Sequence, residues 1–430
     1  MTRPTDSRSR PRTAARTLVA LAALILPVAW AHAQIYLRGH TDALPGTIGK
    51  VSVAGVQLEG EATADPAQAK PGKVIGWDLV RQLRGLDGEL ATQAARFKSP
   101  ADSLWRARTR LERGDFLAAT PLLETLYEKG PFGPTGGPSS AVLYEGVLRS
   151  RLFEGRSASA VWPWLDWLRL RSIAGRKGRD TWQGGSIKLA AIVDPDTGLS
   201  GRLPPIFSLA QNGAALRALS TSDQWKRYEE GDELTRDLAA LFALSVRFEV
   251  STGDSGVSPE LPLPALKLNE EPVLLVAEIV RSRVATAEER ALARARLRKR
   301  IDSFSAPATA DPLAEGSASS LDAAPSARWM ESWCRAALGR SLLRDPDPTQ
   351  QRLGIIELLH VPARFADATP ELAALALREA ADAIERLGDS AGARRLRSEL
   401  MGLTGQIPDT ESSESSEPTG DEAPPPRPPQ

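Results

Sequence analysis

The fold is decided by residues 99–172, which open with 99-SPADSLWRARTRLERGDFLAATPLLETLYEKG-130 and continue with 141-AVLYEGVLRSRLFEGRSASAVWPWLDWLRLRS-172. Apolar residues recur at helical spacing on both sides of a break at Gly114, and the same plan returns around Gly155. Each half therefore predicts a pair of helices, the first beginning at the cap Ser99-Pro100. The two breaks are about forty residues apart, which favours a helical repeat array.

Residues 1–33 have the pattern of a secretory signal peptide. Five arginines precede an almost purely apolar run over 18–30, and Ala31-His32-Ala33 is a small-residue cleavage site. The apolar run is shorter than the ~20 residues that span a bilayer, so cleavage is favoured over an uncleaved anchor. No later segment is apolar enough to span a membrane. We therefore expect export to the periplasm, the cell envelope or the outside of the cell.

Charge and cysteine content limit the classes of function. Basic and acidic residues balance at 54 each, and losing five arginines and one aspartate with the signal leaves about −4. This balance argues against a nucleic-acid binder. Cys334 is the only cysteine, so an internal disulfide is impossible. Only His40 and His360 remain after cleavage, which disfavours a histidine-rich metal site or a Ser/His/Asp triad. We expect no cofactor.

The organisation predicted for the rest of the chain follows composition and periodicity. Period-two alternation predicts a small β module over 34–85, with Trp77 in its core. The remaining predicted parts are a helical repeat block with irregular middle loops (86–302), a flexible linker (303–327), C-terminal helical repeats (328–403) and a disordered acidic, proline-rich tail (404–430). Within the block, the apolar run 273–280 is open to two interpretations, a helix or a buried strand.

The clearest repeat pattern lies near the C-terminus. It consists of Leu377, Ala380, Ala381, Ile384, Leu387, Gly388 and Asp389, followed by Ala393 and Leu396. Gly114-Asp115-Phe116 and Ala119 fit the same turn and second helix. These segments resemble divergent tetratricopeptide-like repeats, with a longer period than that family's repeat. The resemblance covers about half of the chain and implies a scaffold for protein partners. We therefore predict a mainly α fold, an α-solenoid of helix pairs with a small N-terminal β module.

Five residues are candidates for partner binding: Trp162, Trp164, Trp167, Arg294 and Arg298. An aromatic row on a concave surface can bind peptide or sugar. However, Trp162 lies nearly opposite Trp164 at helical spacing, so part of the set belongs to the core. The two arginines belong to a basic run on one helix, which is either a solvated face or a contact for an acidic partner.

Two acidic motifs are interpreted as turns. The segment 194-DPDTG-198 begins like a calcium loop but is followed by Leu199, Gly201 and Leu203 where the loop needs further oxygen donors. The carboxylates over 229–233 are adjacent in sequence, whereas glycosidases hold two carboxylates at a set separation across a cleft. The sequence therefore assigns no catalytic, cofactor-binding or metal-binding residues.

The predicted function is an exported helical-repeat scaffold or adaptor that binds another protein in the cell envelope through its inner helices. One alternative is an envelope hydrolase that acts on glycan or peptide with carboxylates such as Glu229, Glu230 and Asp232. A deep pocket with two close carboxylates would favour it. The other alternative is a sugar-binding module with exposed tryptophans, which a shift of tryptophan fluorescence on adding glycan would favour.

Overall fold

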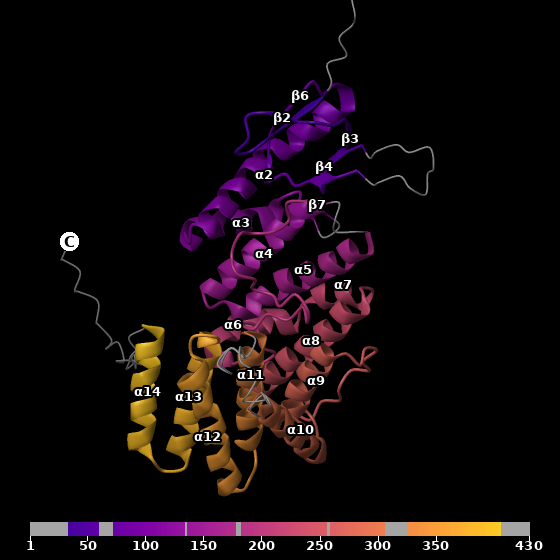
Figure 1. The fold of residues 1–430 in the computed structure, drawn as a ribbon. Coiled ribbons are helices and arrows are strands. Elements are labelled where there is room, and N and C mark those ends of the chain that lie inside the picture. Colours follow the sequence, from indigo (N-terminus) through magenta and orange to yellow (C-terminus); the bar gives the residue numbers. More distant parts are fainter. Residues whose placement is uncertain are drawn as a thin grey trace, which may run out of the picture. The chain divides into compact units, whose positions relative to one another are not determined.

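The computed structural model describes residues 33–59, 72–133, 136–177, 182–255, 259–305 and 325–405. These residues form 13 α-helices packed in neighbouring pairs and two small N-terminal sheets (Figure 1). The predicted fold class, mainly α with a small β module, is thereby confirmed. The predicted signal peptide, most of the linker and almost all of the tail lie outside the described residues.

The chain divides into two compact units. The first comprises Met1–Gly146 with Ala174–Ile187, and the second comprises Val147–Ile173 with Lys188–Gln430. Two helices, α4 (Pro138–Phe153) and α5 (Ser157–Lys177), contribute residues to both units.

Two sheets make up the β part of the first unit. One has the order β2 (Ala43–Leu44), β1 (Gln34–Leu37), β6 (Val80–Arg84). The other has the order β3 (Ile48–Ser52), β4 (Gly55–Leu58), β5 (Val74–Ile75), β7 (Trp182–Gln183). All neighbours are antiparallel except β5 and β7, which pair in parallel with Val74 opposite Trp182.

Trp77 is the centre of this β part, as predicted. It is 2% exposed, its indole N–H donates to the Ser52 carbonyl over 2.8 Å, and its ring stacks on Phe97 at 5.0 Å. Strand β7 lies within a stretch predicted to form irregular middle loops. Two residues cannot show a period-two pattern, so this strand had no detectable signal.

The first helix, α2 (Gly88–Glu112), begins well before the predicted start at Ser99, so that prediction is wrong. Pro100 lies inside the helix. The backbone of Asp87 is extended and provides the N-terminal boundary. Most of the residues between this boundary and Pro100 are good helix formers, and their summed propensity offsets the hydrogen bond that proline removes.

The predicted Gly-Asp turns are confirmed at two places. Before α3 (Phe116–Lys129), Gly114 has φ +81°, and the Asp115 carboxylate accepts the Ala118 N–H over 3.2 Å. Before the last helix, Gly388 has φ +95°, and Asp389 accepts the Gly392 N–H over 2.8 Å. In both turns glycine supplies the left-handed residue that ends one helix and aspartate caps the next.

The second unit is a series of helices. In chain order they are α6 (Leu209–Ser220), α7 (Lys226–Glu229), α8 (Glu233–Ser255), α9 (Glu271–Val284), α10 (Ala287–Ser305), α11 (Pro325–Leu342), α12 (Pro348–Phe365), α13 (Pro370–Arg386) and α14 (Ser390–Thr404). The run 273–280, for which the sequence left a helix or a strand open, is part of helix α9. Helix α10 begins where Thr286 and Glu289 each accept the backbone N–H of the other.

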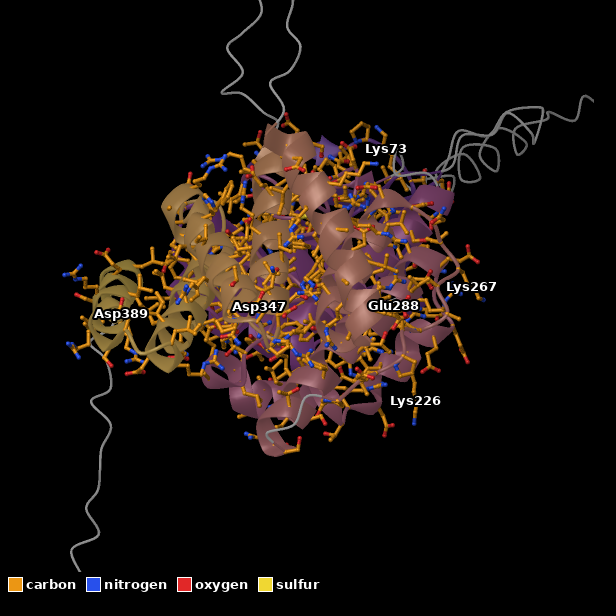
Figure 2. The ribbon with its side chains drawn as sticks, turned by 90° about the horizontal axis from the view of Figure 1, so that it is seen from below. Lys73, Lys226, Lys267, Glu288, Asp347 and Asp389 are labelled. Carbon is orange, nitrogen blue, oxygen red and sulfur yellow. The ribbon has the colours of Figure 1, made fainter. Side chains whose placement is uncertain are left out.

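The helices from α9 onward pack as successive pairs. Helix α11 contacts α9 and α13 as well as its neighbours α10 and α12, so α9, α11 and α13 form one layer. Helices α10, α12 and α14 are the second members of the pairs. Figure 2 looks onto this unit with Glu288, Asp347 and Asp389, at the starts of these three helices, in a row. This packing is of the α-solenoid kind.

None of the helices in the described ranges combines the length and the apolar composition that crossing a bilayer requires.

Cys334 is predicted to be unreactive in the folded protein. It is fully buried on α11, and this burial raises the pKa of its thiol to about 12. The thiolate, which is the reactive form, is therefore scarce at mildly alkaline pH. We expect a disulfide reagent to leave the native chain unlabelled and to label one thiol per chain in concentrated guanidinium. The variant Ser303→Cys, at an exposed position on α10, is the control and should label at once. Rapid labelling of native Cys334 would contradict its burial.

Candidate functional site

A hollow of about 520 Å³ lies along the layer of α9, α11 and α13. We call it the charged hollow, and its lining residues are Arg283, Leu343, Arg344, Glu379, Asp382, Glu385 and Arg386. Arg283 is near the end of α9, Arg344 follows α11, and Arg386 ends α13. Three helix C-termini thus contribute to one surface. The unsatisfied carbonyls and negative dipole ends of these helices explain locally why arginine is favoured there.

A network of buried charges, which we call the floor, adjoins the hollow through the lining residues Arg283 and Glu379. Glu249 of α8 accepts from Arg283 Nε and from an Arg340 Nη atom, both over 3.2 Å. Arg340 also binds both carboxylate oxygens of Glu379 over 2.8 Å. The network joins α8, α9, α11 and α13, and it therefore fixes the helices that carry the lining residues.

Attraction between opposite charges outweighs the effect of burial for both Glu249 and Arg340. Burial alone would raise the pKa of Glu249, but the guanidinium groups of Arg340 and Arg283 outweigh it and lower the pKa. Burial likewise opposes the charge on Arg340, but Glu249 and Glu379 outweigh this effect and raise its pKa. Both groups therefore carry their charges in the folded protein.

Arg344 lies at the edge of this network, where repulsion from Arg283 and Arg290 exceeds the attraction of more distant carboxylates. Its guanidinium lies over the Phe248 ring at 5.0 Å and donates to the Arg283 carbonyl. Burial, together with repulsion from Arg283 and Arg290, lowers the pKa of Arg344 to about 10. Among the described residues, no carboxylate lies within ion-pair distance of it. A negative group entering the hollow would relieve this repulsion.

Each carboxylate in the acidic wall of the hollow has an arginine partner. Asp382 and Glu385 pair with Arg397 of α14 over 3.1 and 2.6 Å, and Glu379 pairs with Arg340. The lining holds three arginines and three carboxylates, and Arg344 is an arginine of this lining without an ion-pair partner among the described residues. Chemically, this arrangement suits the binding of a carboxylate held by another molecule.

The predicted tryptophan candidates belong largely to the interior. Trp164 is 1% exposed, and its indole N–H donates to the Gly198 carbonyl over 3.0 Å. Trp162 is half-buried with its ring 4.4 Å from that of Trp225, and Trp167 is half-buried beneath Arg171. The structure does not bring the three rings together, and none of them lines the charged hollow.

The two predicted arginines have different environments on α10. Arg294 pairs with Asp345 over 2.9 Å and lowers the pKa of that carboxyl. Arg298 is exposed to solvent. Neither residue lines the charged hollow.

The acidic motifs form turns and caps, as interpreted from the sequence. Asp194 accepts the N–H groups of Asp196 and Thr197 over 3.0 and 2.8 Å, which makes a plain hydrogen-bonded turn. Asp232 caps α8 through Thr235, and Glu229 and Glu230 are exposed. Within the described ranges, no group of three or more His, Cys, Asp or Glu residues is placed to hold a metal ion.

The residues of the charged network were not identified from the sequence. One signal was present: a charge inside an apolar run, as at Arg340 in 336-AALGRSLL-343 and at Glu249 in 246-VRFEV-250, where Arg247 is charged as well. Such charges are buried only when paired. Their partners lie 34 to 91 positions away along the chain, so sequence spacing could not match them.

Comparison with known proteins gives no match to a family model, to a curated protein or to a solved structure.

Proposed function

We propose that this chain is an exported helical-repeat scaffold or adaptor that binds another protein in the cell envelope through the charged hollow. The export part of the proposal comes from the pattern of residues 1–33. The scaffold part is supported by the stacking of helix pairs, because stacked pairs present side chains from several helices on one continuous surface.

One observation favours the charged hollow as the surface that binds the partner. Arg344 lines an open hollow of about 520 Å³ without a carboxylate partner among the described residues, while the arginines beneath it are paired. The site offers a rigid cationic group on a floor held by four helices. Its chemistry fits an acidic segment of a protein partner, in which a carboxylate pairs with Arg344.

The test is capture of the partner with matched charge reversals. Tagged full-length chain is crosslinked mildly in the cells that produce it and purified in three forms: wild type, Arg344→Glu and the control Arg352→Glu. Arg352 is exposed on α12 and does not line the hollow. We expect one protein to be recovered with the wild type and the control but about tenfold less with Arg344→Glu, a change that corresponds to loss of one charged contact.

Two results would contradict the proposal. One is equal recovery of the partner with Arg344→Glu and with Arg352→Glu, which would place the interface elsewhere. The other is recovery of the chain alone in all three forms. Circular dichroism of each variant confirms that the helices are retained.

A further inference from the structure

The first unit contains a separate pocket of about 310 Å³ between β6 and the first half of α2. Its apolar part comes from Trp77, Leu83 and Leu86 and from the alanines of α2. Ala91, Ala94 and Ala95 lie at i, i+3 and i+4 on one helix face, where their small side chains leave space opposite the strand. A pocket of this volume with a mostly apolar lining falls at the lower end of the range of small-molecule sites.

The polar part of the pocket is cationic. Arg38, Arg81 and Lys98 line it, and the only acidic lining residue, Asp102, is already paired with Arg38. The guanidinium of Arg38 is further held over the Trp105 ring at 4.5 Å. The pocket therefore combines an apolar cavity with a surplus of positive charge.

Arg38 also has an unused donor. Its side chain is only 14% exposed, and its Nε atom is enclosed without a hydrogen-bond acceptor among the described residues. A buried donor without an acceptor is unfavourable, and this one is held inside the pocket wall by the ion pair of Arg38 with Asp102. The guanidinium of Arg38 therefore contributes a fixed positive charge to the lining of the pocket.

We infer that this pocket binds a single-chain amphipathic carboxylate. The alkyl chain packs against Leu83, Leu86 and the alanines of α2, and the carboxylate accepts from Arg38 and pairs with Lys98 or Arg81. A cavity of about 310 Å³ lies at the lower end of the range of small-molecule sites, which suits one alkyl chain of moderate length. The inference does not depend on the proposed partner binding, since the charged hollow belongs to the other unit.

The test uses decanoate, below its micelle-forming concentration, titrated into the full chain in a calorimeter. Decylamine and decanol have the same chain with a cationic or neutral head. We expect decanoate to bind at least about tenfold more tightly than either, because only the carboxylate matches the arginines and Lys98. Binding of the full chain to anionic phospholipid vesicles is measured as well, and we expect none.

Two variants, Ala94→Leu and Lys98→Glu, test whether decanoate binds in this pocket, and a third variant is the control. Ala94→Leu fills the pocket, and we expect it to weaken decanoate binding by about tenfold or more. Thr92→Leu is the control, because Thr92 is exposed on the same helix and does not line the pocket. Lys98→Glu should weaken decanoate binding and spare decanol. Absence of decanoate binding, equal binding of decylamine, binding to vesicles alone, or equal effects of the two leucine variants would overturn the inference.

Discussion

Replacing Arg340 by methionine is expected to lower the free energy of unfolding by about 3–5 kcal/mol at neutral pH. Arg340 is 5% exposed and binds Glu249 and Glu379, which are the two acidic ends of the buried network. Methionine fills a similar volume but leaves Glu379 without its partner and Glu249 with Arg283 alone. Chemical denaturation of the two proteins, followed by circular dichroism, measures the difference.

The control for this prediction is Arg397→Met. Arg397 also bridges two carboxylates, Asp382 and Glu385, but its side chain is 43% exposed. Exposed ion pairs contribute little, so we expect a change within about 1 kcal/mol. Equal decreases in the free energy of unfolding for Arg340→Met and Arg397→Met would contradict the burial of the network.

We expect the difference in the free energy of unfolding between wild type and Arg340→Met to be smaller at acidic pH than at neutral pH. In the wild type the pKa of Glu249 is lowered, so its stabilising contribution is present above the unfolded pKa and is lost as pH falls through the folded pKa. In the variant, Glu249 loses one arginine, and protonation of its carboxylate relieves the buried charge. The cost of the substitution should therefore be smaller at acidic pH than at neutral pH, and a constant cost would contradict this explanation.

The second large effect is expected at Trp164. Its side chain is enclosed, with the ring 4.7 Å from Phe242, so Trp164→Ala should lower the free energy of unfolding by about 3–5 kcal/mol through lost burial and a cavity. Trp105→Ala is the control. That ring is 37% exposed, and we expect a cost of about 1 kcal/mol. A cost at Trp164 no larger than at Trp105 would show that Trp164 is accessible, as a role in binding would require.

Local signals predicted the fold well where one short segment decides the outcome. The Gly-Asp turns at Gly114 and Gly388 and the capping box at Thr286 are confirmed because the backbone conformation and the cap partner lie within four residues. Pro100 misled the prediction because proline is favourable at a helix start yet tolerated within a helix that has good helix formers on its N-terminal side.

The features that the sequence did not predict depend on contacts between residues far apart along the chain. Strand β7 exists only because Val74 and Trp182 meet in parallel, although more than a hundred residues separate them. The charged hollow has the same origin: Arg283, Arg344 and Arg386 end or follow three different helices, and only the packing of these helices brings them together. The sequence could indicate that isolated charges in apolar runs are paired, but not with which residues.

The most direct test of partner binding through the charged hollow is photocrosslinking from defined positions. A photoreactive amino acid is placed at position 386, which lines the hollow, and in a second protein at position 352, which is exposed on α12 outside it. Both proteins are irradiated in the producing cells. We predict a discrete adduct with one protein from position 386 and none from position 352. An adduct from position 352 alone, or the same adduct from both positions, would contradict binding through the hollow.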